Sequence, residues 1–479
     1  MSGKSGPCRL SPRRFGAHGT PGCGYGVAAV CPRAAAKSTG TARRARALRL
    51  RGNAAQVGQD DGRDEIVIQA LFARIAGPPE QAHEAANGLR HIAALSMTKL
   101  ADGLLDPKLV LAWLLNALGV PAGFVSALVP IREAGALLPQ VFLAGLLDKM
   151  RARRWMWAAG SFVEGLAAGA IALAALTLDG AAAGWVFVAA LALFAVARAA
   201  ASVSYKEVLG KTIGQSRRGA VTGFAGSVAS AGVVVFAGLL VTGRIEGTGA
   251  LAGAVGLAAL LFIAGAVVFS TLREMPSEPG DTASGLALFR YFREDPNFTR
   301  FVVARGFLTA TALSPPYIVL LTGDAEGGAL NRLGALVIAS AAAAFVSSWI
   351  WGRFADRSSR LVLGTAGVIG AAAMALAVAV AGLGLAPAYG LPGALFVLMV
   401  AHHGVRGGRS TYLVDIAPED ARAGYAAASN TAIGALLLVA GLFGGALSFI
   451  GPAAALAGFA GLAVIGAGVA LGLEEAEDG

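Results

Sequence analysis

Two short charged stretches determine how this chain is organised: GLLDKMRARR at residues 145–154 and GRFADRSSR at residues 352–360. In each stretch an aspartate follows a long apolar segment, and a group of arginines fills the turn before the next apolar segment begins. The two aspartates, Asp148 and Asp356, lie 208 residues apart. Because Lys and Arg are retained on the cytoplasmic side of a membrane, the two stretches predict equivalent cytoplasmic turns in a duplicated membrane bundle.

The composition also indicates a membrane bundle. Hydrophobic residues make up 56% of the chain, charged residues make up 14%, and 66 residues are glycine, which is outside the range of soluble globular domains. A bilayer core of about 30 Å requires roughly 20 apolar residues per helix. We expect twelve spans, near residues 91–117, 124–147, 156–178, 184–205, 219–243, 250–272, 300–321, 329–351, 361–383, 391–413, 424–448 and 452–473.

The second stretch has the spacing GxxxDRxxR and resembles the loop signature of the major facilitator superfamily. The first stretch matches less well, because Ala144 and Arg151 occupy the two glycine positions of that signature. The resemblance implies an all-α membrane protein with twelve transmembrane helices in two pseudo-symmetric six-helix bundles. It also implies that spans 1, 4, 7 and 10 line a central cavity, with the substrate site between the two repeats.

The net charge of +10 does not indicate nucleic-acid binding, because the excess lies in a leader at residues 1–62. Residues 1–57 hold eleven Lys and Arg residues, no acid and all three cysteines, so the rest of the chain is close to neutral and has no disulfide or thiolate metal site. The composition matches an organelle transit peptide. We favour the alternatives, which are a disordered tail or translated sequence upstream of the true start.

The rest of the chain divides into five expected parts. These are a cytoplasmic amphipathic segment at 63–90, a six-helix bundle at 91–272, a cytoplasmic linker at 273–299, a second six-helix bundle at 300–473 and an acidic tail at 474–479. The distribution of Lys and Arg places both termini in the cytoplasm. We expect a monomer in the lipid bilayer of a bacterial inner membrane, or of an organelle inner membrane if the leader is a transit peptide.

Ionisable side chains inside spans are the functional candidates, because a charge in hydrocarbon is costly. In span 1, Lys99, Asp102 and Asp106 are three and four residues apart, which places them on one helical face. A carboxyl buried near the bilayer midplane can load and release a proton. The alternative, to which we give equal weight, is a static charge balance of Lys99 with Asp102 and of Asp106 with Lys108.

Spans 2 and 4 supply further candidates for the substrate and proton pathway. Glu133 is a second candidate proton carrier, and its neighbour Arg132 is a candidate anchor for an anionic substrate. For both residues an interhelical ion pair is the alternative. Arg198 in span 4 is either a substrate or relay residue or the counter-charge of the span 1 aspartates.

Span 10 carries His402, His403 and Arg406. Adjacent histidines diverge on a helix, and no Cys, Asp or Glu stands three or four residues away to complete a metal site. We therefore expect no metal and no cofactor. His402 is a candidate proton relay, with helix packing as the alternative, and Arg406 is a further pathway candidate.

The resemblance implies a secondary active transporter that moves a small molecule by alternating access, and the buried carboxyls favour protons as the coupling ion. We assign conformational gating to the charged turns, which comprise Asp148, Arg153, Asp356, Arg357 and Arg360. A non-transporting membrane receptor or scaffold on the same fold is the alternative. An enzyme is disfavoured because no nucleophile–base pair or metal-ligand set is legible.

Overall fold

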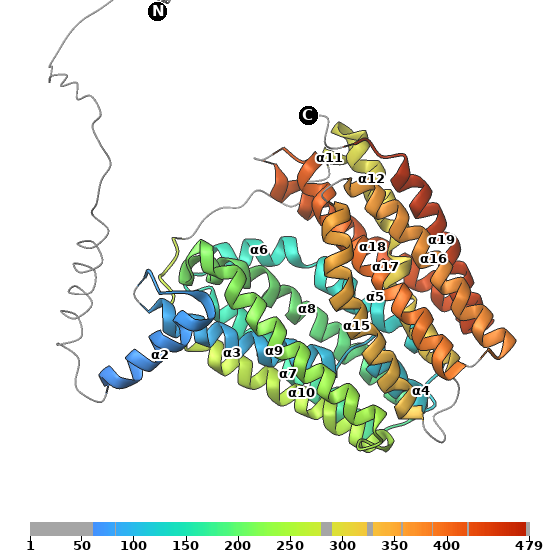
Figure 1. Cartoon of the computed structure of the whole chain (residues 1–479), viewed down its shortest axis with the longest axis horizontal. Coiled ribbons are helices and arrows are strands. Elements are labelled where there is room, and N and C mark those ends of the chain that lie inside the picture. The colour runs from blue at the N-terminus through green and yellow to red at the C-terminus, as the bar shows by residue number, and fades with distance from the viewer. Residues whose placement is uncertain are drawn as a thin grey trace, which may run out of the picture. The chain divides into compact units, whose positions relative to one another are not determined.

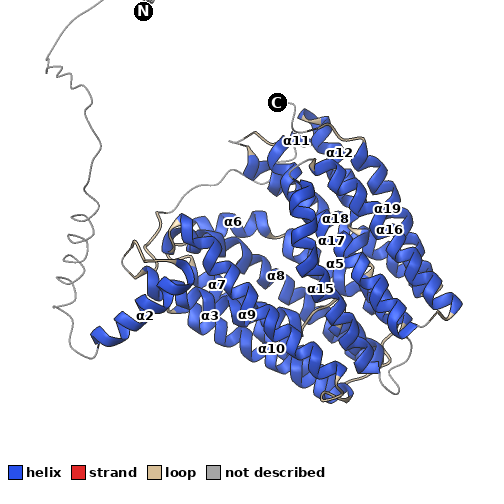
Figure 2. Ribbon diagram, viewed as in Figure 1, coloured by secondary structure: helices blue, strands red, loops and turns tan. Residues whose placement is uncertain are grey.

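The structure is a computed structural model that describes residues 61–81, 83–278, 290–322, 329–355, 358–385, 387–418 and 421–475. The chain divides into two compact units, residues 1–63 and 64–479. The expected leader, the central part of the expected linker and the end of the acidic tail lie outside the described residues. The described part of the second unit is helical and contains no strand (Figures 1 and 2).

The first half of the membrane bundle runs from α3 to α10, after a surface helix, α2 (Asp61–Ala76). Its helices are α3 (Glu84–Leu104), α4 (Val110–Ala117), α5 (Ala122–Leu137), α6 (Gln140–Asp148), α7 (Arg154–Thr177), α8 (Gly180–Thr212), α9 (Gln215–Val241) and α10 (Gly247–Ser270).

The second half runs from α12 to α19 and follows a single helical turn, α11 (Tyr291–Glu294). Its helices are α12 (Pro296–Leu308), α13 (Ala310–Leu313), α14 (Pro315–Leu321), α15 (Ala329–Ala355), α16 (Ser359–Leu383), α17 (Pro387–Ile416), α18 (Arg422–Ser448) and α19 (Pro452–Leu471).

Ten of these helical segments are long and apolar enough to cross a membrane, by length and composition. They coincide with ten of the twelve expected spans, counting α5 and α6 together as span 2. Spans 1 and 7 correspond to broken helices, α3 with α4 and α12 to α14. The described helices are therefore consistent with twelve spans, two of them interrupted.

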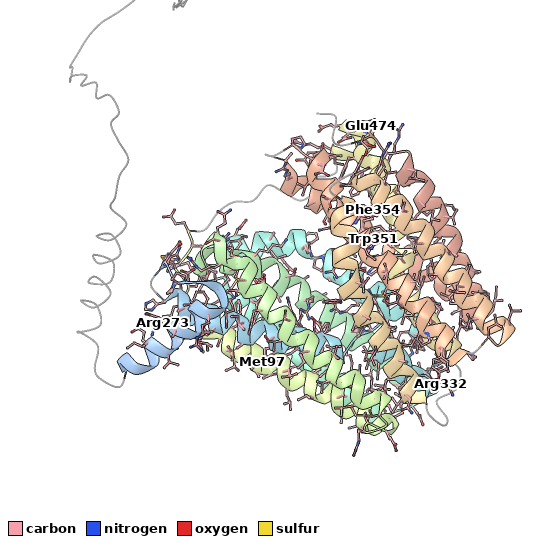
Figure 3. The ribbon with its side chains drawn as sticks, in the orientation of Figure 1. Met97, Arg273, Arg332, Trp351, Phe354 and Glu474 are labelled. Carbon is pink, nitrogen blue, oxygen red and sulfur yellow. The ribbon has the colours of Figure 1, made fainter. Side chains whose placement is uncertain are left out.

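The ends of the helices define two faces of the bundle. The turns at 149–153 and 271–278 meet, because the Ser277 backbone N–H donates to the Arg151 carbonyl at 2.8 Å. We call this the basic face. At the other ends, the Gly180 N–H donates to the Leu118 carbonyl at 2.9 Å, and we call this the opposite face. Arg273 lies near the basic face and Arg332 near the opposite face (Figure 3).

Small residues allow the helices to approach closely. A Cβ at Gly160 of α7 would lie 2.8 Å from the Ala197 carbonyl of α8, so only glycine fits there. At Gly334 of α15 a Cβ would lie 2.8 Å from the backbone nitrogen of Val241, which ends α9. Packing of small residues in this way is how membrane helices associate without a hydrophobic driving force.

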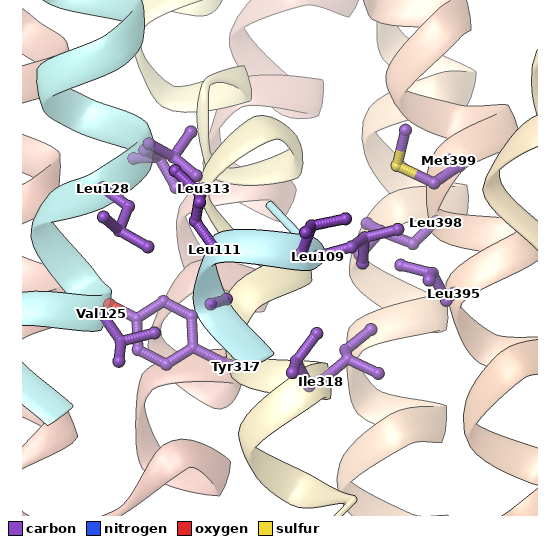
Figure 4. Packing of buried hydrophobic residues seen from close by; sticks show 14 of the residues in the cluster. Leu109, Leu111, Val125, Leu128, Leu313, Tyr317, Ile318, Leu395, Leu398 and Met399 are labelled. Carbon is purple, nitrogen blue, oxygen red and sulfur yellow. The ribbon is translucent and has the colours of Figure 1, made fainter. Parts of the chain in front are cut away.

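The two halves share one hydrophobic cluster. Leu111 of α4 and Val125 of α5 lie among Leu313, Tyr317 and other side chains of the second half (Figure 4). This shared core and the contact of α9 with α15 hold the halves together toward the opposite face, and the charged residues of the candidate site lie next to the core.

Candidate substrate and proton pathway

Four charged side chains of the first half form one network. The Arg132 Nη2 of α5 lies 3.1 Å from the Asp102 Oδ1 of α3, and Arg198 of α8 donates to the same oxygen. The Arg198 Nε lies 2.7 Å from the Glu164 Oε1 of α7. Asp102 is therefore shared by two guanidinium groups, and Arg198 joins two carboxylates. We call these four residues the N-half network.

Aromatic rings enclose the arginines of this network. The Arg132 guanidinium lies over the Phe194 ring at 5.1 Å, and the Arg198 guanidinium lies 5.5 Å from Phe194 and 5.6 Å from Phe262. Cation–π contacts of this kind stabilise a desolvated guanidinium. The side chain of Glu164 is 0% exposed, while Asp102 keeps 28% of its side-chain area exposed.

The N-half network is electrically balanced when both acids are ionised, since two carboxylates face two guanidinium groups. A proton on either acid leaves one positive charge in excess. Because Arg198 donates a hydrogen bond to Asp102 and pairs with Glu164 by charge alone, protonation of Asp102 frees a donor of Arg198 for another anion. The arrangement can therefore exchange a proton for a change in the arginine contacts.

The predicted helical face of span 1 is wrong for Asp106. The α3 helix ends at Leu104, and Asp106 lies in the break before α4, where its Oδ1 accepts from the Lys108 backbone N–H at 2.7 Å. The cause is Pro107, which lacks an N–H and disfavours the helical conformation at the residue before it. Lys99 is exposed, and its Nζ contacts the Thr222 carbonyl of α9 at 3.4 Å.

Asp102 interacts electrostatically with Lys99, as the alternative of a static balance proposed, but its close ion pairs are with other residues. Within the described residues, the ion pairs of Asp102 are with Arg132 and Arg198. The expectation of an interhelical ion pair for Arg132, and of counter-charge for Arg198, therefore matches the observed contacts.

A second group of charged residues lies where the two halves meet. The Lys108 Nζ lies 3.4 Å from the His402 Nε2 of α17, and the His402 Nδ1 lies 3.2 Å from the Thr311 Oγ1 of α13. Glu133 of α5 interacts electrostatically with Arg406 and Arg409 of α17. Residues of span 1 and span 2 therefore interact with residues of span 10 across the interface.

Arg305 of α12 is the buried cation of the second half. Only 5% of its area is exposed. Its Nη1 donates to the Ser429 Oγ of α18 at 2.7 Å, and its Nη2 donates to the Asn430 Oδ1 at 3.0 Å. Both partners are neutral, and the Nε has no hydrogen-bond partner among the described residues.

The charged turn after α6 makes ion pairs and hydrogen bonds within the first half. The Arg153 guanidinium contacts Asp148 at 3.4 Å and also pairs with Glu207 of α8. The backbone N–H groups of Arg153 and Arg154 donate to the carboxylate of Glu274, at 3.2 and 2.8 Å. This turn therefore ties α6 and α7 to α8 and to the start of the linker.

The charged turn after α15 is only partly described. Asp356 and Arg357 lie outside the described residues. The Arg360 Nη1 donates to the Leu473 carbonyl at 2.9 Å, and its Nη2 pairs with Glu475 at 2.5 Å. Arg360 thus contacts the end of α19, in the same half.

Glu164 and Arg305 are ionisable residues inside expected spans, but the sequence analysis assigns no role to them or to Arg409. Glu164 is the only acid between residues 154 and 177, and a single acid in an apolar span is a signal that could have identified it. Arg409 follows Arg406 by three residues on α17. No sequence pattern indicates that Ser429 and Asn430 are the partners of Arg305.

Two other kinds of site are not supported by the described residues. An open groove between α7 and α10 is lined by apolar residues, among them Gly165, Gly169, Gly256 and Leu260. It has no ionisable side chain that could carry a proton or pair with a charged substrate. No group of three or more His, Cys, Asp or Glu residues in the described part of the chain is arranged to hold a metal ion.

Comparisons with known proteins identify the family of this chain. The model of the Major Facilitator Superfamily matches residues 93–434. A search of curated proteins found no significant match.

Solved structures that resemble the chain are membrane transporters. A point mutant of the nucleoside transporter NupG is 12% identical with a TM-score of 0.63, and the match covers 81% of this chain and 99% of NupG. The inward-open xylose transporter XylE from E. coli is 12% identical with a TM-score of 0.59, covering 81% and 97%. A peptide transporter, POT, in complex with sulfate is 14% identical with a TM-score of 0.60, covering 84% and 97%.

At these identities the solved structures establish the fold alone, while the family model covers more than half of the chain. The protein is thus an integral membrane protein with the fold and span organisation expected from its charged turns, and it belongs to the Major Facilitator Superfamily, a family of transporters.

Proposed function

We propose that the protein is a secondary active transporter that moves a small molecule by alternating access and is driven by protons. The observation that carries this proposal is the N-half network, in which the completely buried Glu164 and the partly exposed Asp102 share Arg198. A carboxyl in hydrocarbon is costly and is a functional candidate by default. Proton coupling needs an acid that can change its charge at the substrate site.

In the proposed cycle, Asp102 receives the proton because it is the exposed acid of the network. The protonated Asp102 weakens its hold on Arg132 and Arg198, and the positive charge that is freed attracts a group of the substrate. Deprotonation restores the ion pairs and returns the network to electrical balance. Glu164 holds Arg198 in position throughout the cycle.

The positions of the contacts between the halves support a state open toward the basic face. Near the opposite face, α15 packs on the end of α9 at Gly334. At the basic face, the described ion pairs, such as Arg153 with Glu207 and Arg360 with Glu475, each join residues of one half. Rocking of the halves would close the basic face, where the gating roles of Asp148, Arg153, Asp356, Arg357 and Arg360 are proposed.

We further propose that the basic face is cytoplasmic, that both termini lie there, and that the protein works as a monomer in a bacterial inner membrane without a cofactor. The Lys and Arg residues of the turns support this orientation. One solved structure with the same fold, 12% identical, is a D-xylose–proton symporter. It supports proton coupling as a mechanism available to this fold.

The proposal is tested with the purified full chain in liposomes. An inward proton gradient is imposed, luminal pH is followed with a trapped dye, and pools of sugars, nucleosides, peptides and organic acids are added in turn. We expect one pool to accelerate proton entry, and a protonophore to abolish accumulation of that pool. If folded protein moves neither protons nor any pool, the alternative of a non-transporting receptor on the same fold is supported instead.

A further inference from the structure

The helices of the second half have almost no negative charge. Helices α12 to α19 contain one acidic residue, Asp415. Its carboxylate accepts from the Ser359 hydroxyl at 3.1 Å, at the basic end of α17. The interior of this half nevertheless contains the buried Arg305. A guanidinium group stays ionised in a protein, and a buried charge without a counter-charge is strongly unfavourable.

The surroundings of Arg305 do not supply that counter-charge. Ser429 and Asn430 provide neutral oxygens, and the charged side chain that acts on Arg305 is another cation, Arg409. Arg409 in turn is repelled by Arg406 and attracted by Glu133 of the first half. The fixed hydrogen bonds orient the Arg305 guanidinium and leave its Nε, which is buried and without a partner in the described part of the chain.

The cluster as a whole is cationic. Lys108, Arg406 and Arg409 act on Glu133, Lys108 also acts on Asp106, and Arg409 acts on Arg305. These four basic side chains have two acids beside them, and both acids also interact with Arg132. The N-half network, by contrast, balances itself. An anion between the halves would therefore be attracted toward Arg305 and Arg409 rather than toward Arg132 and Arg198.

We propose that Arg305 and Arg409 form a binding site for an oxyanion group, a carboxylate or phosphate, of the transported molecule. Ser429 and Asn430 position Arg305, and the anion supplies the negative charge that the interior of the second half lacks. The two arginines would bind it with charge-assisted hydrogen bonds, the strongest that side chains form. The inference rests on the proposed transport function and assigns an anionic substrate class to it.

The binding site is tested without knowledge of the substrate, with the full chain in a neutral detergent and with inorganic phosphate and succinate as probes. Thermal unfolding is followed at constant ionic strength, adjusted with sodium chloride. We expect phosphate or succinate to raise the unfolding temperature of the wild type in a saturable way. Arg305→Gln should weaken this affinity about tenfold or more, because charge-assisted hydrogen bonds are lost.

Matched variants keep the result interpretable. Arg300→Gln removes an exposed arginine of the same helix, α12, and should leave the affinity unchanged. Arg409→Gln leaves Arg305 and its hydrogen bonds intact and should also weaken the affinity for the probe. It replaces Arg305→Gln in the test if Arg305→Gln does not fold. Equal stabilisation of the wild type, Arg305→Gln and Arg409→Gln, or no stabilisation by either probe, would overturn the proposal.

The source of the anion and the transport function are separated by two further results. Stabilisation that depends on Arg305 but occurs only with phosphatidylglycerol, and with neither soluble probe, would indicate a lipid headgroup and overturn the assignment to a substrate. Proton-driven uptake of a neutral molecule, unchanged in Arg305→Gln, would overturn the anionic class while leaving the proposed transport function standing. Binding of phosphate at Arg305 without transport of any pool would support the anion site and contradict the proposed transport function.

Discussion

The two halves of the molecule share a fold but treat their buried charges in different ways. In the first half, Arg132 and Arg198 are neutralised by Asp102 and Glu164. In the second half, Arg305 has only neutral partners among the described residues. A pseudo-symmetric backbone therefore holds a self-balanced network on one side and a cationic cluster on the other. We propose that the first group changes its charge during transport and that the second group binds an anion.

The largest effect on stability is expected from breaking the balanced network. Arg198→Leu leaves the fully buried Glu164 without its cation, and removal of one partner of a buried ion pair costs about 3–5 kcal/mol. A pronounced fall of the unfolding temperature in detergent would show this. The double variant Arg198→Leu with Glu164→Leu should recover much of the loss, and equal instability of the single and double variants would contradict the balance.

Arg305→Leu should be milder, because it removes a charge that has no counter-charge. The variant leaves the hydrogen-bonding groups of Ser429 and Asn430 without their donor, at a cost of about 1–3 kcal/mol, and this is offset by relief of the unpaired charge. We expect a smaller loss of unfolding temperature than for Arg198→Leu in the same detergent. A loss as large would indicate that Arg305 has a counter-charge after all, and the contrast between the halves would fail.

The two charged turns at the basic face also differ in how well their arginines are paired with acids. The Arg153 side chain is 11% exposed and pairs with two acids, whereas Arg360 is 32% exposed and pairs with Glu475 near the end of the chain. Exposed ion pairs contribute about 0–1 kcal/mol, so Arg360→Ala should destabilise less than Arg153→Ala. Unfolding temperatures measured side by side check the order.

Asp356→Asn should in addition slow turnover more than it weakens substrate binding.

Lys99→Gln should have the smallest effect, within about 0.5 kcal/mol, as is usual for surface substitutions. The lysine is exposed, and its contact with the Thr222 carbonyl is long, at 3.4 Å. Proton-driven uptake should also be unchanged. A strong defect in uptake with normal folding would show that Lys99, as well as Asp102, belongs to the pathway in span 1.

The sequence was sufficient for the fold because hydrophobic length and the charged turns are local signals. It also placed Asp102, Arg132 and Arg198 inside apolar spans as candidates, since a charge in an apolar span is visible without a structure. It offered pairing of Arg198 with a span 1 aspartate as one alternative, but it did not predict the pair of Glu164 with Arg198, which depends on the packing of α7 against α8. The helical spacing of Asp102 and Asp106 was misleading, since α3 ends at Leu104, between the two aspartates and shortly before Pro107.

The central claim, proton coupling through Asp102, is tested most directly by measuring proton-driven accumulation. The Asp102→Asn variant is placed in liposomes and given the substrate pool that the wild type accepts. Glu246→Gln, at an exposed residue before α10, is the matched control. The account predicts that Asp102→Asn loses accumulation against a gradient but retains exchange of labelled for unlabelled substrate, while Glu246→Gln retains both. Unchanged accumulation by Asp102→Asn would contradict proton coupling through the N-half network.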